Sequence, residues 1–317
     1  MRIRWGAAFG AAIGAAVGLA AGTGAEADYP DKPVQFVVPW PPGDLEDILT
    51  RMIAEDFQAA YDQPAAVVNK PGGGGGPFPG AIEVATAPPD GSMIGSFVIG
   101  VPVVGPQIGI PELSPDPFEP IGIFLTYPFV IVASGSAPYA SMEELAAYAS
   151  DNPVVLGHFG APLTPTQVTL AMAREMGFAY ASDAAFDVLD CNSLASGDVD
   201  VMNTTLQLVL PCLDDITVLA SVTGERIALT PDAPTVAEIV PSLDIALWNG
   251  LFVHKDTPAD VREKIAAVAR ETVMSDRAQE LAAQTGAQVY WLPAAESKAQ
   301  IATDIETSAR IAEILGN

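Results

Sequence analysis

Apolar runs of strand length alternate with helical repeats along the chain, and this alternation constrains the fold more than any other feature. The run Val34-Gln35-Phe36-Val37-Val38 is typical of a buried strand. Apolar side chains then recur at helical spacing from Leu45 to Phe57, which predicts an amphipathic helix over about 44–60. Strands separated by helices are typical of doubly wound sheets. The sequence therefore predicts an α/β protein with parallel sheets.

The same pattern predicts further elements, bounded by turn and capping signals. Expected strands lie over about 65–69, 93–99, 154–159, 199–202 and 289–292. Expected helices lie over about 81–86, 141–148, 164–176, 184–195, 257–274 and 294–315. The helix at 164 has a strong start signal, because Thr164 fits the N-cap, Pro165 the first helical position and Gln167 the capping box.

The charge balance limits the partners. The chain has 317 residues, of which 14 are Lys or Arg and 39 are Asp or Glu, so the formal net charge is -25. Phosphate binding needs a basic face, and we therefore expect no nucleic-acid partner and no binding to an anionic membrane surface. A hydrophobic content of 50% is enough for a large core, and the length fits two domains better than one.

The N-terminus has the features of an export signal. Arg2 and Arg4 precede an apolar run over 6–22, and Ala25-Glu26-Ala27 matches the small-x-small pattern of signal peptidase sites. We predict cleavage after Ala27, a mature chain over 28–317 and a periplasmic location. The alternative, an uncleaved membrane anchor, is disfavoured because the apolar run is short for a membrane span.

The two cysteines leave one question open. Cys191 and Cys212 are the only cysteines of the chain. In an oxidising compartment they could form one disulfide, whereas two buried thiols are the alternative, and spacing does not decide between them.

Catalytic and metal motifs are absent. HExxH and GxSxG do not occur, and His158 and His254 are the only histidines. Asp44, Glu46 and Asp47 are interpreted as acids that offset the positive end of a helix rather than as metal ligands. We expect no catalytic residue, no metal site and no cofactor. An exported hydrolase with a dispersed histidine site remains an alternative, because triads assemble from distant residues.

One local geometry occurs twice. The strand over 34–38 runs through a Pro/Gly loop into a helix near Asp44, and the strand over 154–159 runs through residues 160–163 into the helix at Thr164. In doubly wound sheets, ligands bind outside the carboxyl ends of strands, and free N–H groups at helix starts hold anions. Two such ends facing across a cleft would bind a small carboxylate.

Short motifs in a particular order carry a family resemblance over 29–317. They are Tyr29-Pro30-x-Lys32-Pro33-Val34, Val38-Pro39-Trp40-Pro41-Pro42-Gly43 with Asp47 and Arg51, Val68-Asn69-Lys70-Pro71-Gly72, Pro89-Asp90-Gly91, Ser196-Gly197-x-Val199-Asp200, Pro231-Asp232-x-Pro234-Thr235-x-x-Glu238, Trp248-x-Gly250-Leu251 and Thr257-Pro258. In these motifs the chain resembles the periplasmic solute-binding receptors of tripartite tricarboxylate transporters.

The resemblance implies a type II periplasmic binding-protein fold, with two doubly wound lobes and a ligand cleft between them. Lobe 1 is expected over 28–128 plus 247–317 and lobe 2 over 129–246. The resemblance also implies a monomer that binds a small organic acid without catalysis and delivers it to membrane permease subunits. A ligand-sensing receptor without transport is a further alternative.

The resemblance also implies the binding residues. They are expected in two loops and one neighbouring segment: Trp40, Pro41, Pro42, Gly43, Asp44, Gly160, Ala161, Thr164, Thr166 and Phe186. Asp47 and Arg51 are expected to be structural. The chain departs from the family pattern where Asp44 replaces a second glycine and where the segment 183–186 lacks the family's lysine. These departures suggest a less charged, more apolar or amino-bearing ligand than citrate.

Overall fold

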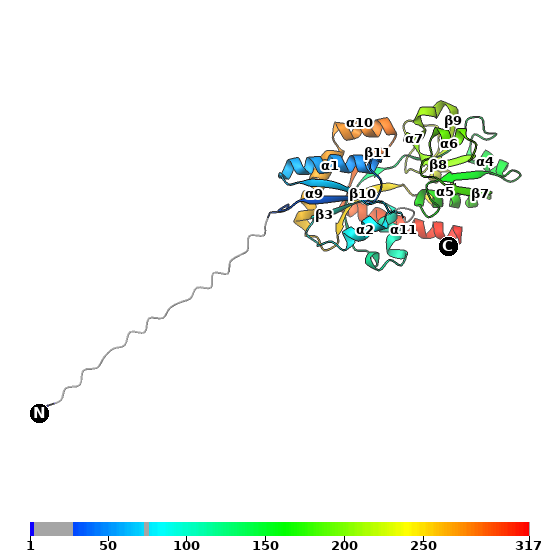
Figure 1. Cartoon of the computed structure of the whole chain (residues 1–317). Helices are drawn as coiled ribbons and strands as arrows, with labels where there is room; N and C mark the ends of the chain where they lie inside the picture. The colour runs from blue at the N-terminus through cyan, green and yellow to red at the C-terminus, as the bar shows by residue number, and fades with distance from the viewer. Residues whose placement is uncertain (3–27, 73–75, 317) are drawn as a thin grey trace.

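The computed structural model describes residues 1–2, 28–72 and 76–316. It contains two mixed sheets, each covered by helices, which form two α/β lobes side by side (Figure 1). The predicted signal peptide lies outside the described residues except for Met1 and Arg2. Within the described ranges, no helix is long and apolar enough to cross a membrane.

The first lobe is built on a six-stranded sheet in the order β11-β4-β10-β3-β1-β2. Its strands are β1 (Val34–Val38), β2 (Ala65–Asn69), β3 (Met93–Val98), β4 (Phe118–Thr126), β10 (Trp248–His254) and β11 (Gln288–Pro293). The helices around it are α1 (Leu45–Tyr61), α2 (Phe78–Ala85), α3 (Gly100–Val104), α9 (Ala259–Val273), α10 (Asp276–Thr285) and α11 (Ala294–Leu315). Short 3-10 helices cover Gly105–Gln107 and Pro111–Leu113.

The second lobe is built on a five-stranded sheet in the order β7-β6-β8-β5-β9. Its strands are β5 (Phe129–Ser134), β6 (Val155–His158), β7 (Ser182–Ala185), β8 (Val201–Thr205) and β9 (Ile216–Ser221). Its helices are α4 (Met142–Ala149), α5 (Thr164–Glu175), α6 (Cys191–Ala195), α7 (Leu206–Val209) and α8 (Val236–Ile239), with 3-10 turns over Leu210–Asp215 and Pro241–Leu243.

The chain passes between the two sheets twice. It leaves the first sheet through Tyr127 and Pro128, which join β4 directly to β5, and returns after α8 to begin β10 at Trp248. A further connection is made by α11, which packs on β4 of the first lobe and on α5 of the second. In Figure 1 this helix runs from the first lobe to the C-terminus beneath the second.

Large apolar side chains fill the first lobe. Phe36, Phe57 and Phe97 are fully buried, and Trp248 is 1% exposed at the start of β10. Each such side chain contributes roughly 1.5–3 kcal/mol relative to its exposed state. The indole of Trp248 also donates to Asp304 Oδ2 on α11 at 2.7 Å, so the returning segment is fixed to that helix by a buried polar contact.

The sheets are mixed, which corrects the expectation of parallel sheets. β1, β2 and β3 run parallel, as do β6, β7 and β8, whereas β4, β10 and β11 pair antiparallel and β5 is antiparallel to both neighbours. The antiparallel pairs lie where the chain enters or leaves a lobe. The chain steps from β4 of one sheet directly into β5 of the other, and it returns to the first sheet along β10.

Two local predictions were wrong. The helix expected over 184–195 is instead the edge strand β7, paired with β6, followed by the short helix α6. Thr164 is not the N-cap of α5: Leu163 holds that position with extended backbone, and Thr164 is the first helical residue. In addition, β4, β5, β9, β10 and α10 were not predicted from the sequence.

The open question about the cysteines is settled by the structure. Cys191, at the start of α6, forms a disulfide with Cys212 in the 3-10 segment after α7, with the two Cα atoms 5.9 Å apart. The bridge joins two short elements that the second lobe's sheet does not connect. No thiol is therefore left for nucleophilic chemistry, since the chain has no other cysteine.

Candidate ligand-binding site

The first loop, residues 40–44, connects β1 to α1. Trp40 is half-buried, while Pro41, Pro42, Gly43 and Asp44 are exposed. Gly43 has a φ of +103°, a conformation that favours glycine, and its N–H donates to Asp47 Oδ2 at 2.9 Å. The loop therefore turns back on the first turn of the helix that it precedes.

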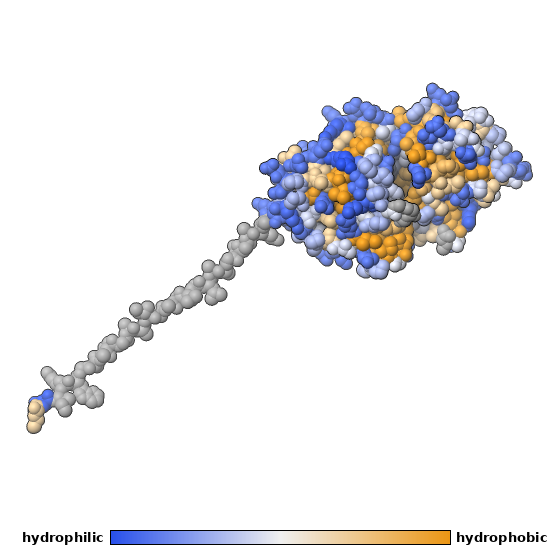
Figure 2. All heavy atoms as spheres, viewed as in Figure 1, coloured by the Kyte–Doolittle hydropathy of each residue, from blue (hydrophilic) through white to orange (hydrophobic). Residues whose placement is uncertain are grey.

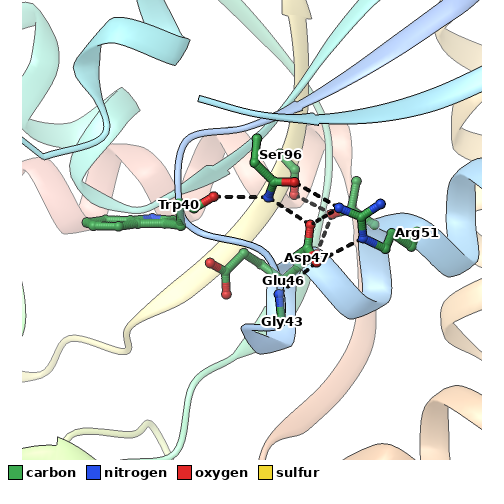
Figure 3. Close-up of polar contacts among 8 residues, drawn as sticks. Trp40, Gly43, Glu46, Asp47, Arg51 and Ser96 are labelled. Carbon is green, nitrogen blue, oxygen red and sulfur yellow. Dashed lines mark hydrogen bonds and ion pairs between the residues drawn. The ribbon is translucent and has the colours of Figure 1, made fainter. Parts of the chain in front are cut away.

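A buried carboxylate fixes the first loop in place. The side chain of Asp47 is 2% exposed and accepts two hydrogen bonds from Arg51, both at 2.9 Å, and one from Asn69 Nδ2 at 2.8 Å. The same Asn69 amide donates to the carbonyl of Trp40 at 3.0 Å (Figure 3). Burial alone would raise the pKa of Asp47, but these donors and the Gly43 N–H outweigh it and lower the pKa. Asp47 and Arg51 thus have the structural role that was expected.

Asp44 occupies the N-cap position of α1, but its side chain accepts no cap hydrogen bond from the helix. Its backbone is extended, and the side chain belongs to the exposed surface of the loop. Partial burial and the neighbouring Asp47 carboxylate raise the pKa of Asp44. The Asp44 carboxylate therefore does not cap the helix that it precedes.

The second loop, residues 159–163, connects β6 to α5. Gly160 and Thr164 are half-buried and Ala161 is exposed, with its carbonyl accepting a hydrogen bond from Gln167 Nε2 at 2.6 Å. Thr166, in the first turn of α5, is fully buried, and its hydroxyl has no hydrogen-bond partner among the described residues. The first turn of α5 thus combines free helical N–H groups with threonine hydroxyls.

Phe186 lies beside the second loop although it is distant in sequence. Its N–H donates to the carbonyl of His158 at 2.9 Å, so it follows β7 at the same edge where β6 ends. The half-buried ring packs against the smaller core cluster of the second lobe. The parallel pairing of β6 and β7 is what brings this residue to the end of the sheet that carries the second loop.

Contacts between the lobes bring the second loop close to the first lobe. A Cβ atom placed on Gly100, at the start of α3, would lie 3.8 Å from Thr164 Oγ1. Gly100 follows β3, and β3 pairs in parallel with β1, whose carboxyl end carries the first loop. In the space-filling view the surface is hollowed between the lobes (Figure 2).

Three aromatic rings extend from the crossing segment to the second loop. Tyr127 and Phe129 have ring centroids 6.2 Å apart, and Phe129 and Phe159 are also 6.2 Å apart, both in edge-to-face geometry. Such pairs contribute about 0.5–1.5 kcal/mol beyond their buried area. The rings fix the start of the second loop against the segment that joins the lobes.

Glu46 is a buried acid beside the first loop, and its burial was not predicted from the sequence. The sequence predicts an acid that offsets the positive end of α1, but Glu46 is 3% exposed, and burial together with the nearby Asp44 charge raises its pKa to about 8. Glu46 lies in the first turn of α1 as expected, but the sequence interpretation did not include its burial. The sequence does carry a signal for this burial: Glu46 lies three residues before Leu49 and seven before Ile53, on the apolar face of the predicted helix.

Polar side chains join the two crossing segments behind the first loop. The Tyr127 phenol, which lowers the pKa of Glu46 against the larger effect of burial, donates its O–H to Asn249 Oδ1 on β10 at 3.3 Å. Asn249 Nδ2 donates to Ser96 Oγ at 2.8 Å, and the Ser96 and Thr50 hydroxyls are also 2.8 Å apart. Figure 3 shows the Glu46 carboxyl turned away from Asp47 and Arg51, on the Trp40 side of the loop.

Two other surface hollows lie on the second lobe. One of about 640 Å³ is lined by Glu143, Ala146, Glu175, Met176, Ile239, Val240, Pro241 and Ser242. The other, of about 500 Å³, is lined by residues of the segments 140–141, 213–219 and 229–234. Neither is lined by a predicted ligand-binding residue.

Two α/β lobes that the chain crosses between twice, with loops at the carboxyl ends of parallel strands, are the architecture of a two-lobed solute-binding protein. The chain belongs to the tripartite tricarboxylate transporter family of receptors, whose family model matches residues 49–316. A relative in Pseudomonas sp. (strain P51), the "UPF0065 protein in tcbD-tcbE intergenic region", is 28% identical over 274 residues, which are 81% of this chain and 79% of the relative.

Solved structures have the same fold. The periplasmic binding protein BugD superposes with a TM-score of 0.74 and 25% identity, covering 91% of this chain and 99% of that one. Rpa4515 of R. palustris, solved with adipate, superposes with a TM-score of 0.74 and 22% identity, covering 91% of this chain and 99% of that one. MatC from Rhodopseudomonas palustris, solved with malate, superposes with a TM-score of 0.70 and 23% identity, covering 90% of this chain and 99% of that one. The family and these structural neighbours are binding proteins, and the predicted type II fold with two lobes is confirmed.

Proposed function

We propose that this chain captures a small organic acid between the first and second loops and releases it unaltered to a membrane permease. The proposal is supported above all by the approach of Thr164, at the start of α5, to Gly100, which follows β3 beside the strand that carries the first loop. Helix starts offer free N–H groups to a carboxylate without any basic side chain. Adipate and malate, held by two proteins of the same fold, are acids of this kind.

The lobes are proposed to span 28–128 plus 247–317 and 129–246. The assignment is supported by the strands, since all six strands of the first sheet fall in the former ranges and all five of the second sheet in the latter. Closure would then turn about Tyr127-Pro128 and the segment that enters β10 at Trp248. Hinge closure around a ligand is a common motion of two-lobed proteins.

The chemistry of the described residues favours binding without turnover. His158 is 1% exposed, and its Nε2 contacts Asp183 Oδ1 at 2.8 Å. Both cysteines are consumed by a disulfide, which also fits an oxidising compartment. We therefore propose a monomeric periplasmic protein, exported by the predicted signal peptide and cleaved after Ala27, with no catalytic residue.

A thermal-shift screen of the mature protein tests this proposal. Adipate, malate, citrate, benzoate and aspartate serve as probes, because a ligand of the folded state alone adds about 2.7 kcal/mol of stability at one hundred times its Kd. Ala161→Trp, which places a bulky side chain on the second loop, is expected to abolish the shift. Ala283→Trp, on the exposed side of α10, is the matched control and is expected to keep it.

Two results would contradict the proposal. The first is the absence of a shift with every probe, and the second is consumption of a probe during incubation, measured by chromatography. Uptake of the labelled ligand by cells with and without the gene then separates transport from sensing. Delivery to a permease predicts that uptake is lost with the gene.

A further inference from the structure

Three phenylalanine residues lie at the edge of the second sheet that carries the second loop. Phe159 directly follows β6, Phe186 follows β7, and Phe129 begins β5. β6, β7 and β8 run parallel, whereas β5 is antiparallel to β8, with Phe129 paired to Thr205 at the carboxyl end of β8. The start of β5 therefore shares one edge of the sheet with the carboxyl ends of β6 and β7.

All three phenylalanines are half-buried, so none of them is sealed in the core of the lobe. Phe129 and Phe159 contact each other edge to face, with ring centroids 6.2 Å apart. The second loop continues from Phe159 to Thr164, which approaches Gly100 of the first lobe. Aromatic rings at the border of a cleft provide the apolar lining that is typical of small-molecule sites. The second lobe therefore offers aromatic surface beside the second loop.

Basic side chains are scarce in the second lobe. Arg174 and Arg226 are the only Lys or Arg residues between positions 129 and 246. Arg174 lies at the far end of α5 from the second loop, and it donates to the carbonyls of the last two residues of α11 at 3.0 and 2.6 Å. Arg226 donates to both carboxylate oxygens of Glu238. Both guanidinium groups are therefore engaged away from the second loop.

The basic side chains beside the first loop are paired with acids. Arg51 donates two hydrogen bonds to Asp47, and Lys70, which follows β2, pairs with Glu83 at 3.2 Å. The exposed carboxylate of Asp44 lies in the loop itself. Taking a charge out of water is costly unless an opposite charge or donors compensate it, and like charges repel. A solute with several carboxylates would therefore be disfavoured at this loop.

Neutral donors nevertheless suit a single carboxylate. α5 has 12 residues, and the first N–H groups of a helix have no acceptor within it. Thr166, in its first turn, is fully buried, and its hydroxyl has no hydrogen-bond partner among the described residues. N–H groups at a helix start can hold a carboxylate without a basic side chain. The region of the second loop thus combines donors for one carboxylate with apolar rings.

We propose that the preferred solute is a monocarboxylic acid with an apolar, ring-sized body, and that Phe159 and Phe186 determine this specificity. The carboxylate is held at the helix starts, and the body lies against the rings at the edge of the second sheet. This inference rests on the proposed function and deepens it by naming the class of acid.

The first test is calorimetry of the mature protein with benzoate, cyclohexanecarboxylate, adipate, malate and citrate. Wild type is expected to bind the two ring acids at least about tenfold more tightly than the other three, because a second carboxylate without a counter-charge is costly to desolvate. Equal affinities, or tighter binding of adipate, malate or citrate, would overturn the inference and leave the proposed function standing. If none of the five acids binds, the proposed function fails for these acids and the inference fails with it.

The second test compares Phe159→Leu with Phe178→Leu. Each variant loses one ring of an edge-to-face pair in the second lobe, since Phe178 pairs with Tyr180 at 5.4 Å beyond the end of α5. Phe159→Leu is expected to bind benzoate up to about tenfold more weakly and to leave malate binding unchanged, and Phe178→Leu is expected to change neither. A loss shared equally by benzoate and malate would assign Phe159 a structural role and overturn the inference.

Phe186→Arg keeps the inference testable where Phe159→Leu does not fold. Phe186 follows an edge strand and is half-buried, so a long charged side chain can extend to solvent. The added guanidinium is expected to shift the ratio of benzoate to malate affinity about tenfold toward malate, because it compensates a second carboxylate. Ala283→Arg, on the exposed side of α10, is the charge-matched control and is expected to keep the wild-type ratio. An unchanged ratio in Phe186→Arg would overturn the inference.

Discussion

Replacement of Asp47 by alanine should release the first loop and destabilise the protein. The carboxylate accepts hydrogen bonds at 2.8–2.9 Å from Gly43 N, Arg51 Nε, Arg51 Nη2 and Asn69 Nδ2, with a side chain that is 2% exposed. Breaking a buried ion pair costs about 3–5 kcal/mol. The Arg51 side chain is 44% exposed, and water can solvate its charge in the variant, so we expect a loss of about 2–3 kcal/mol.

The assay is urea unfolding followed by circular dichroism, with ligand affinity measured in parallel. Glu55→Ala is the matched control, because Glu55 also lies on α1 and forms an ion pair, in this case with Arg277 on α10. The Glu55 side chain is 70% exposed, and such surface pairs contribute about 0–1 kcal/mol. Asp47→Asn keeps the shape of the side chain and separates the lost charge from the lost packing. If Asp47→Ala lowers the free energy of unfolding no more than Glu55→Ala does, the hydrogen bonds of Asp47 do not stabilise the first loop as proposed.

Three further changes have defined outcomes. Asp44→Gly should strengthen binding of malate or adipate about tenfold in calorimetry by removing a like charge worth roughly 1.4 kcal/mol, with Asp62→Gly at the other end of α1 as control; unchanged affinity would remove Asp44 from the site. In wild type, the pKa of Asp304, raised to about 6, favours the protonated native state, so up to about 3 kcal/mol of stability is lost as pH rises from 4 to 6. Asp304→Asn should remove this pH dependence, and identical pH profiles of unfolding in wild type and variant would contradict the prediction. Cys191→Ser with Cys212→Ser should cost about 3 kcal/mol, from the chain entropy of a loop of about 20 residues, and an unchanged urea midpoint would refute it.

Much of the first lobe could be predicted from local pattern. The strand Val34–Val38 and the strand Ala65–Asn69 match their predicted bounds, since each is a short, largely apolar run between turn residues. The α1 helix follows from apolar spacing, and the α5 helix from a proline near its start and Gly177 at its end. In these segments local propensity and tertiary packing favour the same structure.

Other segments needed information that local pattern does not carry. The β4 strand contains Pro120 and Gly122, which weaken a strand signal, and it forms because β10 and β11 pair with it on either side. The alanines of 184–185 have helical propensity, but pairing with β6 makes them a strand. Threonine is a residue type favoured at N-caps, yet Leu163 is the N-cap of α5 and Thr164 is its first helical residue.

The candidate site shows the same division. The two loops could be located from strand, loop and helix order, because ligands bind at the carboxyl ends of strands in α/β sheets. The burial of Glu46 could not, since Tyr127, which acts on its carboxyl, comes from a crossing segment 81 positions further along the chain. Burial of one carboxyl among such distant residues is a property of the tertiary structure.

A crystal structure of the mature protein with a solute identified in the binding screen tests the central claim most directly. We predict a carboxylate of the solute within hydrogen-bond distance of backbone N–H groups at the start of α1 and of α5, with the two lobes closed around it. A solute bound instead in the hollow lined by Glu143 and Ser242, or held by one lobe alone, would contradict the account.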